Sequence, residues 1–156
     1  MGKGTIDPVQ RVIAESEIRN IVARLGHLAD DGDIDEYLSL LTEDASWETP
    51  GRPPRVGHDN LRTRIVEDRE SGIQGPGAAT RHVNTTLWVA VDDEDNAWAE
   101  SYWMYVTGAN GGSAGKYNAE GGTTPIIQMT GRYRDTFRRT PDGWKMASRT
   151  ILQNIN

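Results

Sequence analysis

The sequence has no cysteine among its 156 residues. Disulfide bonds, thiolate nucleophiles, and zinc or iron–sulfur sites with cysteine ligands are therefore excluded. The chain also lacks any run of 18 apolar residues, and its first ten residues, MGKGTIDPVQ, contain no apolar segment of the kind that signal peptides carry. We therefore expect a cytoplasmic protein that does not enter a membrane.

Positive charge is in the minority, because 17 lysines and arginines face 23 aspartates and glutamates and the net charge is −6. Nucleic acids and anionic membrane surfaces are bound by clustered lysine and arginine. Arginines do gather near the C-terminus, but a solvated strand face explains such a run; they are Arg132, Arg134, Arg138 and Arg139. We expect neither a nucleic acid nor a membrane as partner.

Motifs for nucleotides and metals are also missing. There is no phosphate-binding loop, no dinucleotide fingerprint, no H-E-x-x-H and no G-x-S-x-G. The histidines are His27, His58 and His82, and of these only His27 shares a helix face with a carboxylate, that of Asp30, which is too few ligands for a metal site. We expect no metal and no cofactor. The remaining carboxylates, imidazoles, tyrosines and arginines suit proton transfer and electrostatic stabilisation.

The N-terminal third predicts helices. Asp7-Pro8 is typical of a helix start, apolar residues then recur at helical spacing, and the pattern ends at Asp31-Gly32. A second short helix is predicted over 34–41, with Leu38 and Leu41 facing inward. A short strand over 45–48 and a surface helix over 57–71 follow.

The rest of the chain predicts strands over 80–91, 97–107, 126–139 and 144–154, with a hairpin turn at 140–143. Residues 108–124 contain six glycines, and this segment is either a mobile flap over a pocket or a disordered loop. Helices followed by long strands indicate a single α+β domain, residues 1–156, with N-terminal helices packed on a curved antiparallel sheet. Both sheet faces carry large apolar side chains and the helices cover one, so we expect a homo-oligomer, a dimer or trimer.

Asp30 is the first candidate for catalysis. It lies in the last turn of the first helix, at the negative end of the helix dipole, which is an unfavourable place for a carboxylate unless it has a function. Ala23 and Gly26 precede it on the same face and leave room for a ligand. The alternative is a solvated helix-end residue.

His82 is the second candidate. In the strand 80–91 it falls on the parity of Asn84 and Trp88, opposite Val83 and Val89. That face is solvent, a partner interface or a polar pocket, and a structural role for this histidine is the alternative.

Tyr105 and Tyr133 are further candidates. Tyr133 shares a strand face with Asp135, and a buried Asp135 needs a partner, which Arg149 on the next strand can supply. A structural Asp135–Arg149 pair and a catalytic role are equally compatible with this pattern.

Three segments of the sequence resemble the SnoaL-like branch of the NTF2-like superfamily and occur in the family order. They are IRNIVARLGHLADDGDIDEYLSLLTEDASW, TRHVNTTLWVAV and GRYRDTFRRTPDGWKMASRTI. The resemblance extends over roughly 17–151 and implies a cone-shaped α+β fold with a pocket between the helices and the concave sheet. Relatives include scytalone dehydratase, a bile-acid dehydratase, a dehydrochlorinase and polyketide cyclases, as well as the non-catalytic small subunits of ring-hydroxylating dioxygenases.

In the dehydratase-like relatives an aspartate at the end of the first helix pairs with a histidine on a strand, and these positions match Asp30 and His82. The sequence departs from the family elsewhere. Leu25 stands near the position where the dehydratases have a tyrosine and the dehydrochlorinase has a lysine. Tyr105 falls where relatives have an acidic residue or a histidine. Arg139 loosely matches an arginine of the dehydrochlorinase.

Two functions follow from these expectations. The first is a cofactor-independent lyase or isomerase, dehydratase-like, acting on a small apolar substrate, polycyclic or aromatic, through an Asp30–His82 acid/base dyad with Tyr105 or Tyr133 stabilising charge. The second is a non-catalytic ligand-binding or assembly subunit that resembles the dioxygenase small subunits.

Overall fold

The computed structural model describes residues 6–107 and 126–153, so the predicted flap at 108–124 lies outside the described residues. The helices are α1 (Pro8–Asp31), α2 (Ile34–Ser39) and α3 (His58–Glu70). The strands are β1 (Leu41–Glu48), β2 (Arg55–Val56), β3 (Thr80–Val91), β4 (Asn96–Thr107), β5 (Ile126–Thr140) and β6 (Gly143–Gln153). In this part of the chain, no helix is long and apolar enough to cross a membrane.

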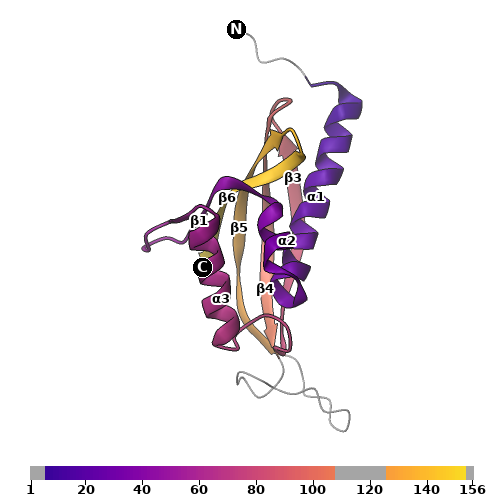
Figure 1. Ribbon diagram of the computed structural model, residues 1–156. Coiled ribbons are helices and arrows are strands. Elements are labelled where there is room, and N and C mark those ends of the chain that lie inside the picture. Colours follow the sequence, from indigo (N-terminus) through magenta and orange to yellow (C-terminus); the bar gives the residue numbers. More distant parts are fainter. Residues whose placement is uncertain (1–5, 108–125, 154–156) are drawn as a thin grey trace.

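The strands form one sheet in the order β2-β1-β6-β5-β4-β3. Neighbouring strands run antiparallel except β1 and β6, which are parallel. The helices lie against one face of this curved sheet, with α1 along β3 and α3 beside β1 (Figure 1). The predicted α+β architecture is confirmed.

The first helix begins as the sequence predicts. The Asp7 side chain accepts hydrogen bonds from the backbone N–H groups of Val9 and Gln10, at 2.9 and 3.2 Å, and Pro8 occupies the first turn. One face of α1 is buried, and its apolar members are Ala14, Ile18, Ile21, Val22, Leu25 and Leu28. This face fixes how the end of α1, with Asp30, sits on the sheet.

The second predicted helix is too long. Helix α2 ends at Ser39, and the strand predicted to begin at residue 45 already begins at Leu41. The cause is tertiary pairing, because the backbone N–H of Met146 on β6 donates to the Leu40 carbonyl at 3.0 Å and Leu41 lies opposite Met146. Leu38 and Leu41 are nevertheless buried, as predicted.

The β5–β6 hairpin confirms the predicted turn. Its strands close at Thr140 and Gly143, and Gly143 has φ +106°, a conformation that favours glycine. Pairing from this turn places Tyr133 opposite Ile151 and Asp135 opposite Arg149. The turn therefore sets the register that builds one end of the functional site.

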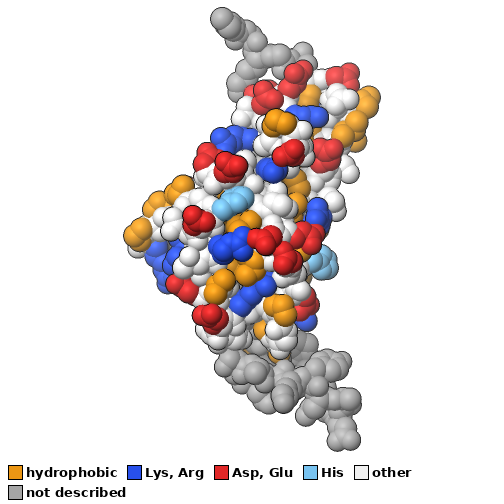
Figure 2. All heavy atoms as spheres, in the orientation of Figure 1, with side chains coloured by type: hydrophobic (Ala, Val, Ile, Leu, Met, Phe, Trp, Pro, Cys, Tyr) orange, Lys and Arg blue, Asp and Glu red, His pale blue; other side chains and the backbone are white. Residues whose placement is uncertain are grey.

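On the face seen in Figure 2, which carries α3 and β1, acidic and basic side chains are interspersed and hydrophobic side chains show between them. Among the arginines near the C-terminus, Arg134 and Arg138 are exposed and pair with Glu100 and Asp44, as predicted for a solvated strand face.

Candidate active site

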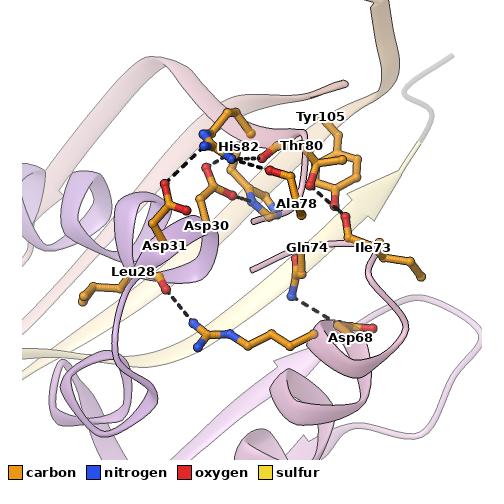
Figure 3. A network of polar contacts seen from close by, with 12 residues as sticks. Leu28, Asp30, Asp31, Asp68, Ile73, Gln74, Ala78, Thr80, His82 and Tyr105 are labelled. Carbon is orange, nitrogen blue, oxygen red and sulfur yellow. Dashed lines mark hydrogen bonds and ion pairs between the residues drawn. The ribbon is translucent and has the colours of Figure 1, made fainter. Parts of the chain in front are cut away.

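Asp30 and His82 are in direct contact at the end of α1. The Nδ1 atom of His82 lies 2.7 Å from Oδ1 of Asp30, and the backbone N–H of His82 donates to Oδ2 of Asp30 at 2.9 Å (Figure 3). A carboxylate can only accept, so Nδ1 carries the ring proton and Nε2 is the basic nitrogen. Asp30 is 4% exposed, which places the pair inside the protein rather than on a solvated helix end.

A bulge in β3 explains how His82 reaches the interior. The pairing of β3 with β4 shifts between Thr85 and Trp88, and Thr86 has φ +52°. Before the bulge, His82 lies opposite Tyr105, and after it Val89 lies opposite Ala99, so all four share the inner face. The uniform alternation predicted for this strand was therefore wrong, because the extra residue reverses the parity and places Val83 on the outer face.

Of Ala23 and Gly26, which were both predicted to leave space for a ligand beside Asp30, only Gly26 does so. Gly26 lines a cavity next to His82 and Asn84, whereas Ala23 is exposed. A β-carbon at Gly26 would lie 3.6 Å from the Asn84 side chain, in ordinary contact, so the helix approaches β3 closely at this point.

Two arginines hold the end of α1 around the dyad. Arg69, from the end of α3, donates to the carbonyls of Leu28 and Gly32 at 2.9 and 2.7 Å. Arg81, next to His82, forms an ion pair with Asp31 at 3.2 Å (Figure 3). These contacts place positive charge at the negative end of the helix dipole, where the sequence alone shows an uncompensated carboxylate.

Tyr105 packs against the dyad, but its hydroxyl is occupied. Its ring centroid lies 4.9 Å from that of His82, and its hydroxyl donates to the carbonyl of Ile73 in the segment that follows α3. Burial raises the pKa of Tyr105, so the group stays protonated at neutral pH. Tyr105 therefore shapes the wall beside the imidazole and ties down the segment after α3.

A cavity of about 630 Å³ opens between the helices and the concave sheet, within the range of small-molecule sites. His82, Tyr105 and Tyr133 line it, and Asp30 lies behind His82. Its apolar and aromatic lining includes Leu25, Ala29, Trp47, Ile65, Ile73, Trp103, Met129 and Ile151. The cavity thus suits a flat apolar ligand with few polar groups.

The floor of the cavity carries an aromatic stack. The rings of Trp103 and Tyr133 are stacked with centroids 5.4 Å apart. Trp103 lies over Gly131 on the neighbouring strand, where a β-carbon would collide with the indole and with the Leu152 carbonyl. Gly131 is therefore required for the close approach that sets this floor.

A second polar pair lies at the other end of the cavity. Arg149 donates to Asp135 through Nε at 2.9 Å and through Nη2 at 2.7 Å, and its guanidinium lies 4.0 Å from the centre of the Tyr133 ring. The predicted partnership of Asp135 with Arg149 is thus present in the structure. Burial raises the pKa of Tyr133 well above its usual value and that of Tyr37 to about 12, so both hydroxyls remain donors at neutral pH.

Sequence reasoning missed several cavity residues. Tyr37 and Trp47 were not among the candidates, and Asn84 was noted only for its parity. Asn84 carried a usable signal, since it lies two residues after His82 on the same strand face. Within residues 6–107 and 126–153, no group of three histidines or carboxylates lies close enough to hold a metal ion.

Known proteins with similar sequences and structures agree with this architecture. Anthranilate 1,2-dioxygenase small subunit of Burkholderia cepacia is 24% identical over 143 residues, which cover 85% of this chain and 81% of that protein. An NTF2-like protein with a cystatin-like fold from Novosphingobium aromaticivorans has a TM-score of 0.74 and 25% identity, over 91% of this chain and 82% of its own. A Catenulispora acidiphila protein solved in complex with S-DNPA has a TM-score of 0.70 and 25% identity, over 92% of this chain and 95% of its own.

The family described as the SnoaL-like domain matches residues 10–150, which include every element from α1 to β6 that builds the cavity. With the helices and sheet arranged as in NTF2-like proteins, the chain belongs to the SnoaL-like family of the NTF2-like superfamily.

Proposed function

We propose that this chain is a cofactor-independent lyase or isomerase, dehydratase-like in mechanism, which acts on a small aromatic or polycyclic substrate. The observation that carries the proposal is the 2.7 Å contact between Asp30 and His82 at the wall of an apolar cavity. A buried carboxylate that orients an imidazole is the arrangement used to prepare a general base.

In this mechanism His82 removes a proton from a carbon next to a carbonyl or a leaving group. Nδ1 stays bonded to Asp30, so Nε2 takes the proton, and the Asp30 carboxylate stabilises the imidazolium that forms. The Tyr105 hydroxyl already donates to Ile73, so it is less available to stabilise the charge that develops on the substrate.

Hydrogen–deuterium exchange tests the first step without knowledge of the natural substrate. 2-Tetralone is incubated with the protein in deuterated buffer, and deuterium uptake next to its carbonyl is followed by mass spectrometry. His82→Gln and Asp30→Asn should each lower the protein-catalysed rate by about 10²–10⁴-fold. The double variant should be little worse than either single variant, because the two residues act as a unit.

His27→Gln is the matched control, since His27 lies on the same helix but is exposed. It should exchange deuterium at the native rate. Full activity in His82→Gln, with a normal melting temperature, would contradict the proposed base.

A second function is supported by the similarity to the dioxygenase small subunit. In that case the outer sheet face binds partner subunits, and this face exposes Trp88 and Tyr102, at 59% and 45%. The enzyme and the assembly subunit can be distinguished by testing whether this chain co-purifies with an oxygenase large subunit encoded beside its own gene. If the chain is an assembly subunit, Trp88→Ala should weaken the complex while His82→Gln leaves it intact, and the native chain should not accelerate the exchange of 2-tetralone.

A further inference from the structure

The cavity wall contains two pairs of the same design. In the first, Asp30 lies behind and His82 faces the cavity; in the second, Asp135 lies behind and Arg149 faces the cavity. The two carboxylates are 4% and 2% exposed and do not line the cavity themselves. Each carboxylate therefore orients a nitrogen-bearing group toward the same ligand space.

Arg149 is fixed more firmly than a surface arginine. Two parallel hydrogen bonds to Asp135 and the Tyr133 ring beneath the guanidinium leave it one orientation. Burial alone would lower the pKa of Arg149, but the Asp135 carboxylate more than reverses this and keeps the group charged. Asp135 uses the Nε–H and one N–H of Nη2, so the other N–H of Nη2 and both N–H groups of Nη1 are left for a ligand.

The neighbours of Arg149 in the cavity are also donors. Tyr37 and Tyr133 line the cavity. The Tyr133 ring lies under the guanidinium, and the Tyr37 ring packs against Trp47, which lies opposite Arg149 on the neighbouring strand. Asp135 balances the charge of Arg149, so this end of the cavity is rich in donors but close to neutral in charge.

We propose that Arg149, held by Asp135 and stacked on Tyr133, forms with the Tyr37 hydroxyl a second ligand subsite. It binds an uncharged carbonyl or phenolic oxygen at the end of an aromatic ligand remote from His82. The inference deepens the proposed function and rests on it only in taking this cavity as the substrate site.

The register gives the length of such a ligand. Across the sheet, His82 on β3 lies opposite Tyr105 on β4, which in turn lies opposite Met129 on β5. Tyr133, whose ring lies under the Arg149 guanidinium, is four residues after Met129 on β5. At about 3.3 Å per residue the two ends are roughly 13 Å apart along the strand. A ligand that reaches both ends is therefore elongated, and a biphenyl frame is a suitable probe.

A matched pair of probes tests the subsite. 4-Acetylbiphenyl and 4-ethylbiphenyl differ only in the carbonyl, and their dissociation constants are measured by displacement of the fluorescent probe N-phenyl-1-naphthylamine. The native protein should bind the ketone about 10-fold more tightly, the order of magnitude of a charge-assisted hydrogen bond in a desolvated site. Tyr37→Phe should reduce this preference several-fold and leave 4-ethylbiphenyl unaffected.

The double variant Asp135→Leu/Arg149→Met removes both charges together and should abolish the preference. Arg134→Met is the control, because Arg134 lies next to Asp135 on β5 but faces outward and pairs with Glu100. His82→Gln should keep the ketone preference while losing deuterium exchange, so the subsite and the dyad can fail separately. Equal binding of the two probes by the native protein, or a preference that survives in both the double variant and Tyr37→Phe, would overturn the proposal. If the double variant does not fold, Arg149→Lys, which keeps the charge but loses the fork, replaces it and should also lose the preference.

Discussion

Removing one member of the Asp135–Arg149 pair should destabilise the protein far more than removing both. Asp135 is 2% exposed and Arg149 6%, so Arg149→Met leaves the Asp135 carboxylate buried without its partner. An unpaired buried charge of this kind costs about 3–5 kcal/mol, which is a large part of the roughly 5–15 kcal/mol that stabilises a typical domain. For a chain of this length the melting temperature should fall by about 6–20 °C.

The double variant Asp135→Leu/Arg149→Met removes both desolvated charges and keeps the volume. Its stability should lie within about 1 kcal/mol of the native value or exceed it, since buried ion pairs often gain little over apolar replacements. Urea unfolding followed by tryptophan fluorescence measures all three proteins, with the denaturant slope as a check on two-state behaviour. This account of the pair would be refuted if Arg149→Met lowered the free energy of unfolding by less than about 1 kcal/mol, or if the double variant were as unstable as Arg149→Met.

Three further predictions follow from the same contacts. Burial raises the pKa of Tyr37 to about 12 and raises that of Tyr133 as well, so near pH 10 the folded protein keeps protons that the unfolded protein loses. The free energy of unfolding should therefore fall as the pH rises from 10 to 12. Tyr37→Phe should make this fall smaller when unfolding by urea is measured at each pH. Arg69→Met should cost about 1–3 kcal/mol and speed amide exchange in the last turn of α1. Arg62 lies on the same helix α3, and Arg62→Met breaks an exposed pair with Asp35 of α2, so it should cost under about 1 kcal/mol; equal effects would show that Arg69 has no special role. Light scattering after size-exclusion chromatography should give a dimer or trimer that Trp88→Glu weakens, and a native 17.3 kDa monomer would contradict an oligomer built on the outer face.

The sequence predicts the fold well where local patterns and packing agree. The Asp7-Pro8 start, the buried stripe of α1 and the turn at 140–143 all depend on residues close together in the chain. Helix α2 shows the limit, because pairing of Leu41 with Met146, more than a hundred residues away, decides where the helix gives way to a strand. Periodicity alone contains no term for such a partner.

The site shows the same division. Asp30 and His82 could each be named from the sequence as separate candidates, but only the family resemblance indicated that they pair, since their contact joins two elements 52 residues apart. The strand pattern argued that His82 and Val89 lie on opposite faces, and only the bulge at Thr86 brings both inside. A bulge with a threonine at φ +52° carries no glycine to announce it, so alternation gives the wrong face at this point. Asp135 and Arg149 could be paired in outline, but the side of Arg149 that faces the cavity depends on the hairpin register.

The charged side chains that line the cavity are mostly arginines. The chain has a net charge of −6, yet the lining includes four arginines, and the carboxylate among the described lining residues is Asp68. The arginines are Arg52, Arg55, Arg64 and Arg149. Burial raises the pKa of Asp68, with Arg64 opposing the shift, so even this acid gives up its proton less readily than a solvated one.

Asp30 and Asp135 lie behind their partners, where they orient a base and a donor without facing the substrate. In the proposed reaction, a carboxylate directly beside the substrate would repel the electrons left on carbon, and the lining carboxylate Asp68 is paired with Arg64. Donors and positive charge that are fixed before reaction stabilise that state without reorganisation, and they act on it more strongly than on an uncharged substrate. This arrangement of donors suits the proposed abstraction of a proton from an uncharged aromatic ketone.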